Sequence, residues 1–197
     1  MNGGDDQRDG AEPSPVETTE RLLLCRPVET DLDELFALYS DPRLAEGDPL
    51  LLHPTRAHTR AVLDRRREQW ARDGLSSWVV RERSTRGGPG LIGIGGCSLF
   101  AGTAWNVAFT LRPDHWGKGY AQEIAAAGIG RARLLRPELP ITAIVAEQNR
   151  RSHRAVERLG LVRAWTGPDA HSPDPTARVV LYADRPLSAE RIDRLTS

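Results

Sequence analysis

The sequence predicts a single α/β domain built on a mixed, mostly antiparallel sheet flanked by helices. The chain has 197 residues, which suits one domain with a sizeable core better than two domains. Three consecutive strand candidates in the middle of the chain predict an antiparallel meander. After them, strand and helix candidates alternate in the order β-α-β-α, and the last strands form a hairpin. This order fits neither a doubly wound sheet nor a purely antiparallel one.

The N-terminal quarter contains a tail, a strand and a helix. Residues 1–18 are rich in Gly, Asp, Glu and Pro without hydrophobic periodicity, so we expect a disordered tail. The apolar run Arg21–Arg26 predicts the first strand. A helix opens at Thr30 or Asp31, and its apolar residues share one face: Leu32, Leu35, Phe36 and Leu38.

Pro and Gly interrupt residues 40–54, and a longer helix follows. Thr55 is its predicted N-cap, and the helix extends to about Asp73. Ala57, Val62 and Trp70 are candidates for the inward face, opposite a heavily charged outer face.

The remaining elements are three strands, a helix, a strand, a helix and a hairpin, with a short helix from about Ser188. Their predicted bounds are Ser76–Arg83, Leu91–Leu99, Trp105–Leu111, Tyr120–Leu135, Ile141–Glu147, Ser152–Leu159, Leu161–Thr166 and Ala177–Asp184. The Gly- and Pro-rich run STRGGPG, residues 84–90, is typical of a hairpin connection. Gly160 is the expected left-handed residue at the end of the second of these helices.

Composition and charge exclude several classes of protein. Basic and acidic residues number 27 each, so the net charge is zero and we expect neither general nucleic-acid binding nor attraction to an anionic membrane. No run of about 18 apolar residues occurs, so we expect no membrane-spanning helix. The N-terminus lacks the basic start and apolar core of a secretory signal, and we expect a cytoplasmic protein. Cys25 and Cys97 lie in apolar runs and are expected to be buried thiols.

The segment Phe109–Glu123, FTLRPDHWGKGYAQE, carries the clearest functional signal. A strand ends at Leu111, and a helix begins shortly afterwards. Gly117 and Gly119 lack a Cβ and allow a ligand to approach the main chain. The N–H groups and dipole of a helix N-terminus favour an anion, and Lys118, the only Lys of the sequence, adds a charge. These features indicate a phosphate-binding turn; a Gly-rich turn without a ligand is the alternative.

Two common phosphate motifs do not fit, and a third pattern does. The chain has no GxxxxGK[ST], and Gln122 stands where GxGxxG requires its third Gly. The segment resembles motif A of the GNAT acyltransferases, [Q/R]xxGx[G/A], with Trp116 first, Gly119 central and Ala121 last. Trp in the first position departs from the general pattern and is similar to the branch of ribosomal-protein N-terminal acetyltransferases (RimJ/RimL-type), where WGKGYA is usual.

Three further pieces match this branch in the same order. TTERLLLCRP resembles its opening strand, SSWVVRE with LIGIGG its central hairpin, and NRRSHRAVERLGL its second signature, in which Leu161 replaces Phe. The resemblance covers about residues 18–184. It implies a GNAT acyltransferase domain over residues 19–186, followed by a short helix or tail over residues 187–197.

The resemblance also implies a binding site for acetyl-CoA or another acyl-CoA, without a metal. In that fold the sheet splays at its central parallel pair, and the donor lies in the V between the two strands. The main chain of the first strand would bind the pantetheine arm, at Phe109, Thr110 and Leu111. The loop before the helix would bind the pyrophosphate, at Trp116, Gly117, Lys118, Gly119, Tyr120 and Ala121.

The implied reaction is direct attack of a neutral amine on the thioester, with a backbone N–H near the end of the 105–111 strand stabilising the oxyanion. Asn149 would bind the pantetheine, and Ser152 would protonate the departing thiolate. A helix cap is the alternative for both residues. Asn106 stands where relatives often carry a Glu base, which leaves Glu147 or a water relay in that role.

The acceptor would be a small-molecule amine or a protein N-terminus, and a homodimer is compatible with the sequence. Two alternatives stay open: the same fold with a non-acetyl, carrier-bound or tRNA-bound donor, and a non-catalytic acyl-CoA-binding domain. His53 and His171 lie in irregular segments that would border the acceptor mouth, although an ordinary surface His is the simpler interpretation of each. The base is left without a firm assignment.

Overall fold

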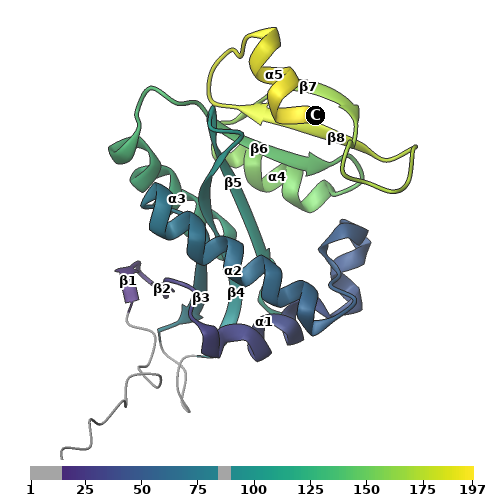
Figure 1. Cartoon of the computed structure of the whole chain (residues 1–197). Helices are drawn as coiled ribbons and strands as arrows, with labels where there is room; N and C mark the ends of the chain where they lie inside the picture. The colour runs from purple at the N-terminus through teal and green to yellow at the C-terminus, as the bar shows by residue number, and fades with distance from the viewer. Residues whose placement is uncertain (1–14, 84–89) are drawn as a thin grey trace, which may run out of the picture.

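The computed structural model describes residues 15–83 and 90–197, which form one eight-stranded sheet with helices on its faces (Figure 1). The strand order is β1-β2-β3-β4-β5-β6-β8-β7. Neighbouring strands are antiparallel except β5 and β6, which are parallel. The predicted mixed, mostly antiparallel α/β class is confirmed.

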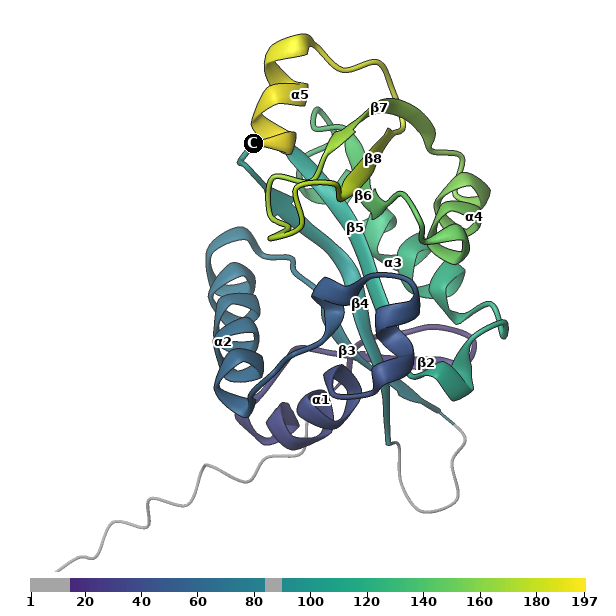
Figure 2. The same ribbon diagram turned by 90° about the vertical axis from the view of Figure 1, so that its right-hand side faces the viewer.

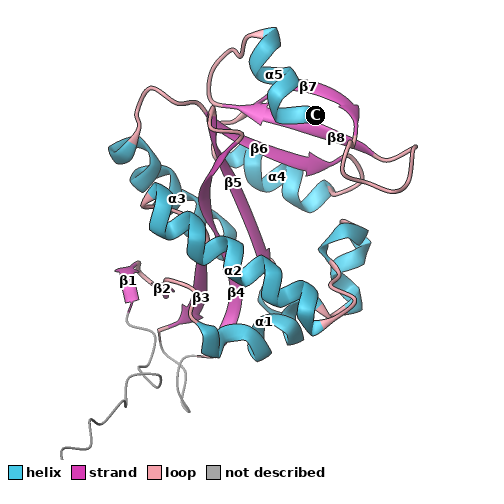
Figure 3. Cartoon of the chain, in the orientation of Figure 1, coloured by secondary structure: helices cyan, strands magenta, loops and turns pink. Residues whose placement is uncertain are grey.

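The elements follow the predicted order (Figure 3). The strands are β1 Pro15–Thr18, β2 Leu22–Cys25, β3 Trp78–Glu82, β4 Leu91–Phe100, β5 Ala104–Leu111, β6 Ile141–Ala146, β7 Val162–Pro168 and β8 Arg178–Ala183. The α-helices are α1 Leu32–Tyr39, α2 Arg56–Asp73, α3 Tyr120–Leu135, α4 Arg150–Arg158 and α5 Ala189–Thr196. Four short 3-10 helices are η1 Glu29–Asp31, η2 Pro42–Glu46, η3 Pro49–Leu51 and η4 Pro113–His115.

The predicted disordered tail is wrong at its C-terminal end. Residues 15–18 form β1, which pairs with β2 through Glu17 opposite Leu24 and Thr18 opposite Leu23. An edge strand obtains its hydrogen bonds from its neighbour, and composition does not reveal that. Residues 1–14, the rest of the predicted tail, lie outside the described residues. So do residues 84–89 of the predicted hairpin connection, although β3 and β4 pair antiparallel as expected.

Helix α2 begins and ends as predicted, but its predicted inward face is only partly right, and Val62 is half-buried. The hydroxyl of Thr55 accepts a hydrogen bond from the N–H of His58 at 3.2 Å. Trp70 is buried, but Ala57 is exposed. The residues in line with Trp70 at helical spacing are Thr59 and Leu63, and both are buried. A charged helix with few apolar residues gives a weak periodic signal, which explains the error in the predicted face.

The helices form two layers around the sheet (Figure 2). Helix α3 packs on one face with α4 beside it, over a core that includes Ile124, Trp105 and Tyr182. Helices α1 and α2 cover the other face, and α5 packs at the β6–β8–β7 end of the sheet through the fully buried Leu195. Cys25 and Cys97 are buried thiols rather than a disulfide, as predicted. Among the described residues, no helix has the length and apolarity needed to cross a membrane.

The parallel pair β5–β6 separates soon after it forms. In the described part of the chain its ladder consists of Trp105 opposite Ile141 and Asn106 opposite Thr142. Beyond Asn106 the two strands diverge (Figure 1). This divergence leaves residues 107–111 of β5 without a partner on the β6 side, although they remain paired with β4. The predicted splay at the central parallel pair is therefore present.

Candidate functional site

A cavity of about 340 Å³ opens where β5 ends, between the beginnings of α3 and α4. We call it the first cavity. Most residues predicted to bind the acyl donor line it: Phe109, Thr110, Leu111, Trp116, Gly117, Gly119, Tyr120, Ala121, Asn149 and Ser152. The fold thus brings together the two sequence segments that were predicted separately to form one site.

The loop before α3 presents its main chain to the first cavity. Gly117 and Gly119 adopt φ angles of 75° and 82°, which L side chains rarely adopt. A Cβ at Gly117 would meet no atom within 4 Å, and one at Gly119 would meet the Arg21 guanidinium at 3.5 Å. The N–H groups of residues 117–121 have no acceptor in the described ranges. The start of α3 is therefore open to an anion, which the helix dipole would stabilise.

Side chains from other elements hold this loop. Trp116 Nε1 donates to the last carbonyl of β5 at 2.9 Å. Arg21, between β1 and β2, donates to the Lys118 carbonyl and to the Glu123 carboxylate, each at 2.8 Å. Burial alone would raise the pKa of Glu123, but hydrogen bonds from Thr19 and Arg21 outweigh burial and lower the pKa. The ionised carboxylate therefore links the β1–β2 turn to the first turn of α3.

Lys118 and His115 show where sequence reasoning was incomplete. Lys118 is exposed and does not line the first cavity, so its role stays a prediction. His115, which had no predicted role, does line it. Burial and the charge of Lys118 lower the pKa of His115, which favours the neutral ring. The Nδ1 atom of His115 is buried and has no hydrogen-bond partner among the described residues.

The opposite wall of the first cavity is the start of α4. Asn149 Oδ1 accepts a hydrogen bond from the N–H of Ser152 at 3.1 Å, so Asn149 is the N-cap and α4 begins at Arg150, two residues before the predicted start. The Asn149 side chain also packs against Gly47, where a Cβ would lie 2.8 Å from Nδ2. Ser152 is half-buried, and its hydroxyl has no hydrogen-bond partner in the described part of the chain. Asn149 thus caps the helix and lines the cavity.

Three arginines on this wall were not predicted. Arg151, Arg154 and Arg158 line the first cavity from one face of α4. The sequence shows the arginines after Asn149, but it does not show which side of α4 faces α3.

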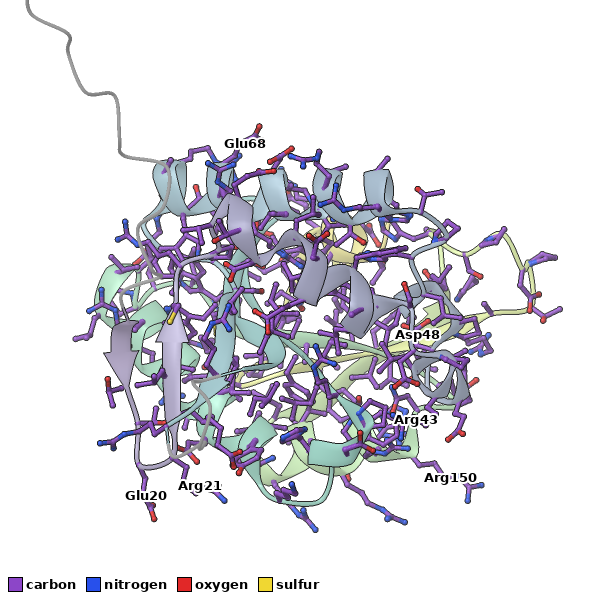
Figure 4. All side chains as sticks on the ribbon, turned by 90° about the horizontal axis from the view of Figure 1, so that it is seen from below. Glu20, Arg21, Arg43, Asp48, Glu68 and Arg150 are labelled. Carbon is purple, nitrogen blue, oxygen red and sulfur yellow. The ribbon has the colours of Figure 1, made fainter. Side chains whose placement is uncertain are left out.

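A second cavity, of about 680 Å³, lies on the other side of the Ala146–Arg150 turn. Its wall carries four acidic and two basic residues: Asp48, Glu147, Asp169, Asp174, Arg150 and Arg178. Figure 4 shows Asp48, Arg43 and Arg150 at one end of the molecule, away from Arg21. Burial and the nearby Asp169 raise the pKa of Asp48. Glu147 belongs to this second wall, where Arg178 Nε lies 3.4 Å from its carboxylate.

Two segments form a partition between the cavities. Leu44, Gly47 and Leu51 line the first cavity, whereas residues 48–50 line the second. In the same way, Asn149 and Ser152 face the first cavity, whereas residues 146–148 and Arg150 face the second. Glu147 and Ser152 therefore lie on opposite sides of one wall.

The two histidines considered for the acceptor mouth line neither cavity. His53 is 8% exposed and stacks between Tyr39 and His58, which contradicts its interpretation as a surface residue. His171 is exposed in the β7–β8 loop, near Asp169. A Pro-rich segment indicates irregular structure but not how deeply a side chain within it is buried.

Asn106 marks the point where β5 and β6 separate. It belongs to the last residue pair of their ladder, and its Oδ1 is buried without a hydrogen-bond partner among the described residues. A buried, unsatisfied carbonyl is costly, which indicates that a donor group or water completes it.

With this fold and site, the chain belongs to the GNAT acetyltransferase family. The profile of the acetyltransferase (GNAT) domain matches residues 21–162, which is most of the sequence. This match over more than half of the chain establishes the family.

A curated relative and a solved structure are similar to this chain. Protein YkkB of Bacillus subtilis (strain 168) is 28% identical over 102 residues, 49% of this chain and 59% of that protein. An acetyltransferase of Agrobacterium tumefaciens str. C58 has a TM-score of 0.67 at 24% identity, covering 91% of this chain and 99% of that one.

Ribosomal-protein N-terminal acetyltransferases are also among the structural neighbours. A Salmonella typhimurium enzyme that modifies the N-terminal serine of ribosomal protein L7/L12 has a TM-score of 0.68 at 14% identity, covering 90% and 100% of the two chains. RimL in complex with coenzyme A has a TM-score of 0.66 at 16% identity, covering 90% and 99%. They share the fold of this chain.

Proposed function

We propose that the protein transfers an acyl group from acyl-CoA, with acetyl-CoA as the simplest donor, to the primary amine of a small molecule or a protein N-terminus. One observation carries the proposal: the open N–H groups of residues 117–121 face Asn149 and Ser152 across a single cavity at the end of a splayed strand. RimL, which has the same fold, holds coenzyme A in its structure.

The described residues fit such a donor. The N–H groups at the start of α3 suit the pyrophosphate, and no acidic residue lies on the described wall of the first cavity. The edge of β5 that β6 leaves unpaired suits the amides of the pantetheine arm. When bound, acyl-CoA would supply the activated acyl group.

The second cavity is where we place the acceptor. Its carboxylates attract a protonated amine, and it adjoins the first cavity along residues 47–51 and 146–152. The amine must lose a proton before it attacks. Glu147 is on the acceptor side of the partition, and we assign it this role, with water as the relay.

Ser152 is placed to act on the leaving sulfur. Its hydroxyl lines the first cavity and is not engaged by another described residue. A hydrogen bond from this hydroxyl to the thiolate becomes stronger as negative charge develops on the sulfur, so it stabilises the transition state more than the bound substrate.

A thiol-release assay tests the proposal. The protein is incubated with acetyl-CoA and a panel of amines that contains an N-terminal peptide, a diamine and an amino sugar. We expect free CoA thiol to form faster with at least one amine than without any. If acetyl-CoA binds but no amine accelerates thiol release, the non-catalytic alternative is favoured. The observation that supports this alternative is Asn106 at the position of the usual Glu base. If acetyl-CoA does not bind, the donor assignment is wrong.

A further inference from the structure

Helix α4 gives the first cavity a positively charged wall. Arg151, Arg154 and Arg158 are separated by three and four residues and therefore share one face of the helix. Gln122 Nε2, in the first turn of α3, donates to the carbonyl of Ala155 at 2.7 Å. This hydrogen bond holds the arginine face opposite the Gly117–Ala121 loop.

One of the three arginines is engaged, and the other two are not. The Arg151 guanidinium carbon lies 3.4 Å from the centroid of the Trp116 ring, a cation–π contact across the cavity. Within the described ranges, the side chains of Arg154 and Arg158 form no ion pair or hydrogen bond. Glu157, their neighbour in sequence, instead accepts a hydrogen bond from Tyr182 at 3.1 Å.

The two exposed arginines leave positive charge on this wall that an anion would neutralise. Like charges one helical turn apart repel each other, and here no described carboxylate offsets them. Two guanidinium groups at that spacing match a phosphate dianion, because each offers parallel N–H donors to its oxygens. The N–H groups of residues 117–121 already provide a separate place for a pyrophosphate.

We propose that Arg154 and Arg158 bind the 3′-phosphate on the ribose of the CoA donor. The inference rests on the proposed function and extends it to donor selection. A CoA thioester carries a phosphate monoester beyond its pyrophosphate, whereas dephospho-CoA lacks it. A phosphopantetheine arm on a carrier protein also lacks this 3′-phosphate. The two arginines therefore make the free, 3′-phosphorylated CoA thioester the preferred donor over the carrier-bound alternative.

Calorimetric titration of the full chain with CoA and dephospho-CoA tests this assignment. We expect the parent protein to bind CoA at least about tenfold more tightly, the effect of losing charge-assisted hydrogen bonds at a partly exposed site. Arg154→Ala and Arg158→Ala should each weaken CoA binding, and the double variant should bind both ligands equally. The affinity for dephospho-CoA should stay unchanged throughout, since the phosphate that couples to the arginines is absent.

The control is Arg136→Ala, which removes an exposed charge at the opposite end of α3. That end lies about 24 Å from the first cavity along the helix axis, so both affinities should match the parent. Melting of the unliganded variants separates weaker binding from unfolding. Arg154→Gln and Arg158→Gln, which remove the charge but keep a long side chain, replace the alanine variants if those do not fold.

Three results would overturn the inference. The variants could weaken CoA and dephospho-CoA equally, which would assign the arginines to the pyrophosphate. The parent could bind both ligands equally. An acyl carrier protein could bind more tightly than CoA, which would assign the arginine face to a carrier. In each case the parent still binds a donor and the proposed function stands. If it binds neither nucleotide nor carrier, the proposed function itself fails.

Discussion

The Ser152 hydroxyl could have a structural role or a catalytic one, and the contacts of the site separate the two. Asn149 is the residue that caps the helix, because its Oδ1 accepts a hydrogen bond from the Ser152 N–H. The Ser152 hydroxyl has no hydrogen-bond partner in the described part of the chain. Its removal should therefore cost little stability. The proposed hydrogen bond to the leaving thiolate should appear in turnover instead.

We expect Ser152→Ala to lower kcat by about 10²-fold or less, because a thiolate leaves readily and water replaces part of the interaction. The affinity for acetyl-CoA and the Tm should change little. Asn149→Ala is the comparison, since loss of the cap costs about 1 kcal/mol of stability. Steady-state kinetics and thermal melting of both variants give the measurement. Full activity in Ser152→Ala would remove Ser152 from the catalytic residues.

Gly119→Val combines two effects that a matched variant separates. At φ 82° a β-branched residue is strained, which we expect to cost about 1–3 kcal/mol of stability. Gly160, at the end of α4, has φ 81°, a Cβ added there would meet no atom within 4 Å, and it lies outside the first cavity. Gly160→Val should therefore lose similar stability but keep its affinity for CoA. Gly119→Val should lose CoA binding as well, measured by calorimetry on folded protein. Equal CoA affinities in the two variants would place the pyrophosphate elsewhere.

Among the elements, those specified by local sequence were predictable. Thr55 and Gly160 mark helix ends through their own side chain or backbone, and the spacing of Gly117 and Gly119 indicated the anion site. Features that depend on packing were missed. Strand β1 exists because β2 offers an edge, and the arginine face of α4 matters only because α3 lies opposite. The partition between the cavities was also not predictable, since it joins segments about 100 residues apart in the sequence.

The connection between η3 and α2 should make the stability depend on pH through His53. Its ring stacks on Tyr39 and His58, and Nδ1 lies 2.9 Å from the Thr59 hydroxyl. Burial, with the charges of His58 and Arg65, lowers the pKa of His53 from 6.5 to about 4. The unfolded chain therefore binds this proton more readily than the folded protein. The contribution of neutral His53 to the free energy of unfolding is therefore complete above pH 6.5 and is lost as the pH falls towards 4.

In denaturant titrations, we expect the free energy of unfolding to fall over this window with a slope of up to about 1.4 kcal/mol per pH unit from His53. Carboxylates titrate in the same range, so the comparison is with His53→Gln, which should show a smaller slope. Identical slopes in the two proteins would mean that His53 is solvated in solution.

Although the net charge of the whole molecule is zero, the charged residues of opposite sign are distributed unequally between the two cavities. Arginines line the first cavity and carboxylates predominate in the second, which suits an anionic donor and a cationic acceptor. CoA should therefore bind to the native state and raise its Tm. At a CoA concentration about 100 times the Kd, binding adds about 2.7 kcal/mol, or about 5–10 °C for a protein of this size. Differential scanning fluorimetry on protein freed of CoA measures the shift. Gly119→Val should show none, and no shift in the parent at millimolar CoA would contradict the donor assignment.

The partition formed by residues 44–51 and 146–152 has a consequence for kinetics. With the donor in the first cavity and the acceptor in the second, as proposed, neither substrate has to leave before the other arrives, and no acylated protein needs to accumulate between two half-reactions. Initial rates measured while both concentrations are varied should give double-reciprocal lines that intersect, the pattern of a ternary complex, rather than the parallel lines of a ping-pong mechanism.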